Sequence, residues 1–225
     1  MSLVGSLVAA GVSNWSRYLG FFSLRGLDEL SGVPATELVY IHSKLVIADD
    51  RVVICGSANI NDRSLLGDRD SELCLRVEDR EFVEGRMNGE RYEAGRFATG
   101  LRKRLFGEHL GLLDEDGKVE DGTVDDPVIE SFYRNVWEET ADRNTAIFDQ
   151  LFSPLPSDTV STLRESKEVQ IEKQPVAETF VSNSRQKLKE IKGHLVRYPL
   201  NYLCQEDLQP SALAKEGMVP SELWK

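Results

Sequence analysis

Residues 40–72 read YIHSKLVIADDRVVICGSANINDRSLLGDRDSE, and this stretch decides how the rest of the chain is interpreted. Residues 38–47 are rich in β-branched and large apolar side chains, and a polar turn of two aspartates and an arginine follows at 49–51. Residues 52–55 are again apolar. The pattern predicts a strand, a tight turn and a second strand that folds back on the first.

Polar residues within this stretch suit chemistry on a phosphate. His42 and Lys44 are two residues apart, so on a strand they face the same way. Lysine supplies a compact positive charge to an anionic oxygen, and histidine can attack phosphorus or move a proton near neutral pH. Ser57 and Asn59 lie in a small polar turn whose hydroxyl, amide and backbone N–H groups can surround phosphate oxygens. A further strand predicted by alternation over 71–77 would bring the Glu72 carboxylate to the sheet, where it could hold the His42 ring.

The spacing HxKxxxxD from His42 to Asp49, followed by GSxN, resembles the HKD signature of the phospholipase D superfamily. The words YIHSKLVIADD, GSANINDRSLL and RDSEL resemble the second HKD motif of the eukaryotic phospholipases D that hydrolyse phosphatidylcholine. Similar wording leads up to the motif and recurs toward the C-terminus. The likeness covers most of the chain and is weak over about 114–124 and 153–186.

The resemblance implies an α/β fold, the α-β-α sandwich of phospholipase D, in which two lobes each give one HKD motif to a shared site. This sequence carries one motif and no internal repeat of it, and because that motif resembles the second HKD motif, the chain resembles the C-terminal catalytic lobe. We expect that lobe over residues 1–113, an acidic linker over 114–126, and a mostly helical C-terminal extension over 127–225 that packs back on the lobe.

The resemblance also implies a role for each site residue. One histidine attacks phosphorus to form a phosphohistidine, while another protonates the leaving alcohol and then activates water. We expect His42 to be the acid and base, with the nucleophile supplied by the absent lobe. Lys44 and Asn59 would bind the phosphate and stabilise its oxyanions with help from Ser57, and Glu72 would fix the His42 tautomer.

Asp49 and the two remaining histidines are expected to have structural roles. Asp49, the aspartate of the motif, is expected to anchor the hairpin or to pair with a cation such as Arg63. His109 and His194 lack the HKD spacing and are expected to be structural.

The implied reaction is hydrolysis of phosphatidylcholine to phosphatidic acid and choline, or transfer to a primary alcohol, with no catalytic metal. The family likeness implies a phosphoinositide activator. It implies three partners: phosphatidylcholine membranes, the N-terminal HKD lobe and, as regulators, Rho- or ARF-type small GTPases. It also implies a cytoplasmic location with peripheral binding to membranes. One motif makes half a site, so we expect this chain to be inactive alone. Two alternatives remain: an HKD-type nuclease or other phosphodiesterase that dimerises, and a non-catalytic fragment.

The composition bears on the class of fold, on the kind of partner and on the state of the cysteines. The chain has 225 residues, of which 40% are hydrophobic, and this is enough for a globular core. A formal net charge of −11 argues against a nucleic-acid partner, because phosphate backbones are held by clustered cations. Cys55, Cys74 and Cys204 are odd in number and are expected to be buried, reduced thiols in the cytosol.

Periodicity predicts the remaining elements. An amphipathic helix is expected over 90–111, with its arginines and lysine on a solvated face. The acid-rich residues 114–126 are expected to be exposed, and a helix is expected from residue 126 to 152. An extended run is expected over 194–203, and the C-terminal residues 218–225 are expected to pack back onto the body.

Overall fold

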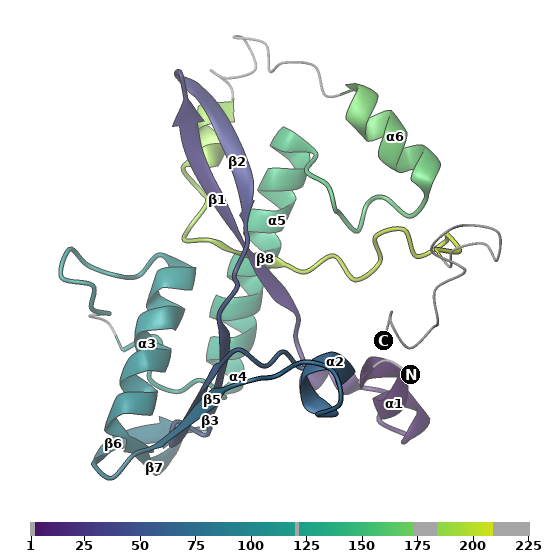
Figure 1. The fold of residues 1–225 in the computed structure, drawn as a ribbon. Helices are drawn as coiled ribbons and strands as arrows, with labels where there is room; N and C mark the ends of the chain where they lie inside the picture. Colours follow the sequence, from purple (N-terminus) through teal and green to yellow (C-terminus); the bar gives the residue numbers. More distant parts are fainter. Residues whose placement is uncertain (1–2, 120–121, 173–183, 209–225) are drawn as a thin grey trace.

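The computed structural model describes residues 3–119, 122–172 and 184–208 (Figure 1). Strands and helices are mixed along these ranges, which confirms the predicted α/β class. The strands are β1 (Phe22–Leu30), β2 (Val33–Val39), β3 (Lys44–Ala48), β4 (Val52–Gly56), β5 (Cys74–Glu78), β6 (Phe82–Met87), β7 (Glu90–Gly95) and β8 (Leu195–Arg197). The helical segments are α1 (Leu3–Ala9), η1 (Trp15–Arg17), α2 (Asp62–Leu65), α3 (Arg96–Leu110), α4 (Glu130–Phe132), η2 (Tyr133–Glu138), α5 (Glu139–Phe152) and α6 (Leu163–Glu172).

Among the described residues the strands form small antiparallel sheets in the orders β2-β1-β8, β3-β4-β5 and β6-β7. The first sheet joins distant parts of the chain, because β8 pairs with β1 through the register Ser23↔Val196. The second is the predicted hairpin with the further strand added at its edge. The structure thus confirms the paired strands and the turn at 49–51 that the sequence predicts.

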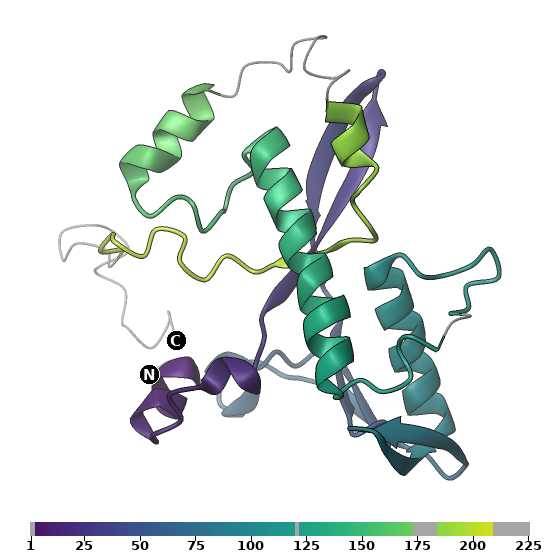
Figure 2. The same ribbon diagram turned by 180° about the vertical axis from the view of Figure 1, so that it is seen from behind.

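The buried core lies between α3, the helix formed by α4, η2 and α5, and the sheet strands β1 and β8. Figure 2 shows α5 lying across β1 and β8. Trp137 is its centre, with the rings of Phe106 and Phe22 at centroid distances of 4.5 and 5.8 Å. The most buried members of this core are Leu110, Val124, Phe132, Trp137, Ala141 and Leu195.

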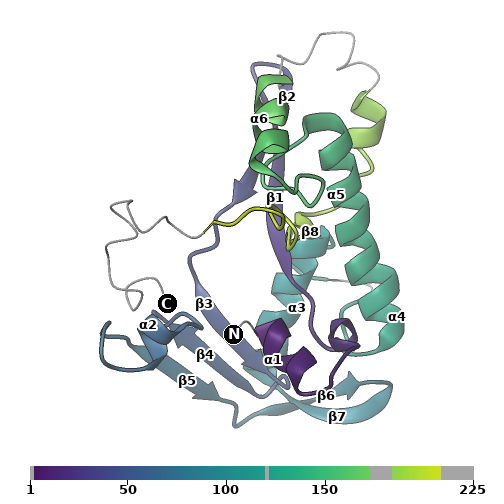
Figure 3. The same cartoon turned by 90° about the vertical axis from the view of Figure 1, so that its right-hand side faces the viewer.

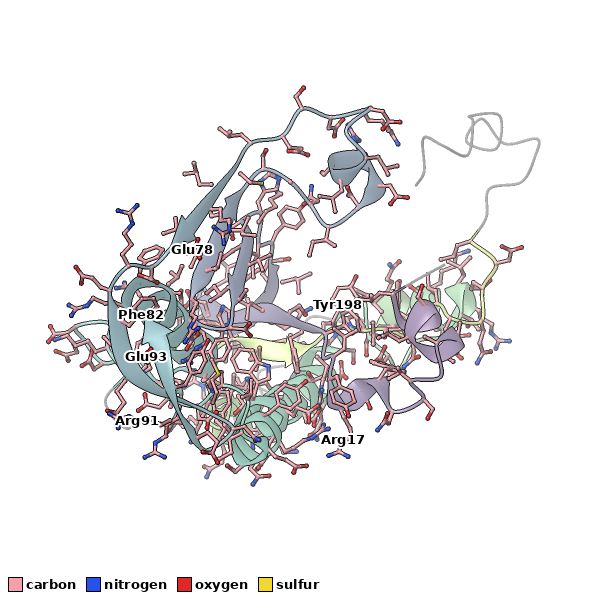
Figure 4. All side chains as sticks on the ribbon, turned by 90° about the horizontal axis from the view of Figure 1, so that it is seen from below. Arg17, Glu78, Phe82, Arg91, Glu93 and Tyr198 are labelled. Carbon is pink, nitrogen blue, oxygen red and sulfur yellow. The ribbon has the colours of Figure 1, made fainter. Side chains whose placement is uncertain are left out.

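The sheet β3-β4-β5 stands apart from this core, and α2 lies at its far end (Figure 3). Within the described ranges, its turn end meets the rest of the molecule closely and its far part does not: Val53 is buried, whereas Leu75 is 65% exposed. At that end Arg51 lies over the rings of Phe82 and Tyr92. Figure 4 shows this junction from below, with Phe82, Arg91 and Glu93 of the β6-β7 hairpin near Glu78 at the end of β5.

Asp126 organises the segment after α3. Its carboxylate accepts hydrogen bonds from the backbone N–H groups of Asn88 and Gly89 in the β6-β7 turn, at 2.9 and 2.6 Å, and from those of Val128 and Ile129. Burial opposes ionisation, but the four N–H groups outweigh it and the pKa of Asp126 lies below its usual value. Val124 and Asp126 are buried, whereas Asp125 between them is exposed. The prediction of an exposed linker over 114–126 is therefore wrong at its C-terminal end.

Several other predictions are corrected by long-range packing. Residues 90–95 form strand β7 rather than the start of a helix, and Arg102 on α3 is buried rather than solvated. Residues 22–39, for which local periodicity predicts no hairpin, form the β1-β2 hairpin. The three cysteines are free, as expected, but exposed rather than buried. The predicted packing of residues 218–225 concerns a segment outside the described ranges.

Replacing Asp126 with alanine should destabilise the fold. The four backbone N–H groups would lose a charged acceptor, so we expect the free energy of unfolding to fall by about 2–3 kcal/mol. Urea denaturation followed by circular dichroism measures this change. The contribution should be complete above pH 3.8, the usual pKa of the group, and should be lost as the pH falls through the lower pKa of the folded state.

Asp125→Ala is the matched control for that experiment. The Asp125 carboxylate makes a surface ion pair with Lys103, at 2.7 Å, and such pairs contribute about 0–1 kcal/mol. Equal losses in the two variants would contradict the role assigned to Asp126.

Candidate active site

The hairpin β3-β4 carries the candidate catalytic residues at the end opposite its turn. Lys44 is the first residue of β3 and pairs with Gly56, the last residue of β4. The small GSAN turn therefore starts directly beside Lys44. His42 lies just before β3 rather than within a strand, because regular pairing begins only at Lys44.

His42 and Lys44 nevertheless remain close together. The Lys44 ammonium donates a hydrogen bond to the backbone carbonyl of His42, at 2.5 Å. The His42 imidazole stacks on the Tyr40 ring, with centroids 6.2 Å apart and an angle of 26° between the planes. His42 is exposed and Lys44 half-buried, so both groups can meet a substrate without a change in the fold.

Ser57 and Glu72 form a second polar group beside Lys44. The Ser57 hydroxyl donates to the Glu72 carboxylate at 2.6 Å and accepts from the backbone N–H of Leu73 at 3.0 Å. Hydrogen bonds from Ser57 and then from Ser64 lower the pKa of Glu72, and the charge of Lys44 adds to the effect. Glu72 is held as a carboxylate by these hydroxyls. Its expected role in orienting the His42 ring stays a prediction.

Asn59 is exposed on the loop that leads from β4 into α2. Two residues later the Asn61 side chain caps α2 by accepting a hydrogen bond from the Ser64 N–H, at 3.0 Å. This cap fixes the loop behind Asn59. The polar groups of the site therefore form an open surface, and among the described residues no cluster of His, Cys, Asp and Glu has the arrangement of a metal site.

The two aspartates of the turn behave differently. Asp49 is exposed, and its backbone carbonyl accepts a hydrogen bond from the Tyr92 hydroxyl at 2.7 Å. Arg63, proposed as its partner, pairs with Asp70 instead. Asp50 is buried and is held by Arg102 through two hydrogen bonds of 2.7 Å. Asp49 thus anchors the turn through its backbone, and its neighbour does so through its side chain.

Sequence reasoning missed Arg102, although a signal was present. Ala98, Arg102 and Phe106 are spaced by four residues and so lie on one face of α3. An arginine at a position of the buried face predicts a buried anionic partner. The two aspartates at the turn, Asp49 and Asp50, are candidates for this anionic partner.

The remaining histidines lie outside the site. The His109 ring lies 6.0 Å from that of Trp137, and burial lowers its pKa. The His109 carbonyl accepts the backbone N–H of His194, at 2.9 Å, and this bond ties α3 to the start of β8. Both residues hold backbone segments of the core together.

Replacing Ser57 with alanine should raise the pKa of Glu72. The hydroxyl is the largest cause of the lowered value, so its removal leaves the carboxylate with weaker stabilisation of its charged form. The pKa can be followed by NMR titration of the Glu72 side-chain carboxyl carbon. Ser71→Ala changes a neighbouring exposed serine and should leave the titration unaltered. An unchanged Glu72 pKa in Ser57→Ala would show that the hydrogen bond does not exist in solution.

Comparisons with known proteins identify the family of the chain. The sequence model of the family described as Phospholipase D matches residues 32–149. Human Phospholipase D1 is 46% identical over 99% of this chain, bovine Phospholipase D2 is 44% identical over 99%, and Phospholipase D zeta 1 of Arabidopsis thaliana is 40% identical over 86%. The chain spans 20, 23 and 19% of the length of these relatives. On this evidence the chain belongs to the phospholipase D family.

Proposed function

We propose that this chain supplies one of two HKD half-sites of an enzyme that hydrolyses phosphatidylcholine to phosphatidic acid and choline. The observation that carries the proposal is the arrangement at one sheet end of an exposed imidazole, an adjacent ammonium and a hydroxyl held by a carboxylate. Each of these groups has a use in cleaving a phosphodiester. Transfer of the phosphatidyl group to a primary alcohol follows the same route when an alcohol replaces water.

In this proposal the reaction needs two histidines. A histidine of the other half attacks phosphorus and forms a P–N bond, while His42 gives its proton to the departing choline oxygen. His42 then takes a proton from water, whose oxygen attacks phosphorus and releases the first histidine. One imidazole cannot be bonded to phosphorus and also transfer these protons, and a positioned acid or base contributes roughly 10²–10⁴-fold in rate.

Lys44 and Asn59 are assigned to the phosphoryl oxygens. Lys44 lies two residues after His42 in the chain, and its ammonium donates to the His42 backbone carbonyl, so it is already held close to His42. Asn59 is exposed on the loop that continues from β4, where its amide can donate to an oxyanion. Charge developing on the oxygens is thus met by donors already in place.

The exposure of the site supports a missing second half. Apolar side chains surround the catalytic residues and are open to solvent: Tyr40 is 83% exposed, Ile60 88% and Leu73 74%. Apolar surface of this kind marks an interface or a lipid-binding surface. We assign it to the other HKD half and to the lipid that binds between them.

The enzyme would act on a membrane surface. Among the described residues, no helix combines the length and apolar character that crossing a bilayer requires. The proposal also includes peripheral binding to phosphatidylcholine membranes, a phosphoinositide activator, and control by Rho- or ARF-type small GTPases. These follow from membership of the family, in which Phospholipases D1 and D2 are several times longer than this chain.

The test is reconstitution from two halves. Choline release from phosphatidylcholine vesicles should be undetectable with this chain alone and should appear when a separately expressed N-terminal HKD half is added. His42→Asn in this chain should lower the reconstituted rate by about 10²-fold or more, because it removes the acid and base.

His194→Asn is the control, since it changes an exposed histidine outside the site and should alter the rate by less than twofold. Cleavage of single-stranded DNA by this chain alone, with no choline release from the reconstituted halves, would instead identify a dimeric HKD nuclease. Inactivity toward both substrates under all conditions would favour a non-catalytic fragment.

A further inference from the structure

Asp50 and Arg102 form a buried ion pair between the catalytic hairpin and α3. Their side chains are only 4 and 5% exposed. Arg102 Nε and Nη2 donate to the two carboxylate oxygens of Asp50, each at 2.7 Å. The pair is bidentate, so it fixes the direction of the carboxylate as well as its position.

Arg102 also binds the segment that follows α3. Its Nη1 donates to the Val124 carbonyl, and its Nη2 lies 3.4 Å from the Asp125 carbonyl and 3.3 Å from the Thr99 hydroxyl. One guanidinium thus joins the hairpin turn, the helix and residues 124–125. A lysine at this position could not satisfy all of these acceptors, because its single ammonium lacks the planar fork of arginine.

The turn that holds Asp50 has a defined and unusual backbone. Asp49 and Asp50 both have left-handed conformations, with φ values of 50° and 49°. The Asp50 carbonyl accepts the Gly95 N–H at 2.7 Å, and Arg51 Nε donates to the Glu93 carbonyl at 2.9 Å. The turn end of the hairpin is therefore fixed to β7 and α3, whereas its opposite end carries exposed catalytic residues.

Because the turn end is fixed and the opposite end is not, a small rotation at the turn displaces the residues at the opposite end. Strand β3 runs from Lys44 to Ala48 beside the turn, which is about 13 Å of extended chain. A rotation of about 5° at the turn would therefore move Lys44 by about 1 Å. A displacement of about 1 Å at reacting groups can lower a rate by about 10²-fold.

We propose that Arg102 is a positioning residue, which acts through Asp50 to set the placement of His42 and Lys44. It does not touch the substrate. Its influence on the reaction rests on the function proposed above, whereas its influence on the hairpin can be measured without catalysis.

The test compares Arg102→Lys with Lys103→Gln in this chain and in the enzyme reconstituted with the N-terminal HKD half. Lys103→Gln is the matched control, because it removes a cation and a surface ion pair one residue away on the same helix. In reconstituted enzyme, Arg102→Lys should lower kcat for choline release by about 10–100-fold and change KM by less than about twofold. Lys103→Gln should change neither by more than twofold.

Hydrogen–deuterium exchange gives the readout that does not depend on activity. At a temperature well below the unfolding midpoint, Arg102→Lys should speed exchange of the amides of β3, β4 and β5, and should leave those of α5 protected as before. Asp50→Asn keeps the shape of the side chain and should have the same effect, and it replaces Arg102→Lys if that variant does not fold.

The outcomes separate the two proposals. If reconstituted wild-type protein releases no choline, the proposed function fails, and local loosening of the β3-β4-β5 sheet still decides the positioning role. Unchanged exchange in this sheet, or an equal increase across α5 as well, would overturn the positioning role. So would an active Arg102→Lys enzyme with an unaltered kcat.

Discussion

The buried pair of Asp50 and Arg102 is the interaction on which the placement of the β3-β4 hairpin depends. A carboxylate and a guanidinium leave water together only when their hydrogen bonds are nearly complete, and here the guanidinium also reaches two backbone carbonyls. These hydrogen bonds therefore fix the position of the Asp50 carboxylate relative to the Arg102 guanidinium. Because the pair lies at the turn, that geometry is transmitted along the strand to Lys44.

The rest of the structure supplies a rigid support for this pair. Trp137 and its aromatic neighbours hold α3 against α5, so Arg102 projects from a helix that is itself buried on one side. Asp126 binds both the β6-β7 turn and the start of the next helix. The carbonyls that Arg102 needs are thus held in place by a second carboxylate close by.

The active surface has the opposite character. His42, Ser57 and Asn59 are exposed, and apolar side chains beside them are uncovered. The chain spans about a fifth of the length of its relative human Phospholipase D1, and in the function proposed above a second HKD half covers this surface. Local hydrogen bonds, such as that between Ser57 and Glu72, order the polar groups before any partner covers them.

The sequence by itself determined the local hairpin and the family. His42, Lys44, Ser57 and Asn59 are close in the chain, and strand pairing over a short turn brings such residues together with little help from other segments. The α/β class followed from the family resemblance that these residues carry. The family could be recognised from the sequence because the motif residues lie close together in the chain, at a characteristic spacing.

Only the tertiary structure decided which charges are buried and which strands pair over long distances. Asp50 and Arg102 are 52 residues apart, and nothing in local spacing distinguishes Asp50 from Asp49 as the buried carboxylate. Likewise, β8 joins β1 across most of the chain, and residues 90–95 become a strand because β6 lies beside them. Burial and pairing of this kind are properties of the packed chain, since they depend on which distant surfaces exclude water together.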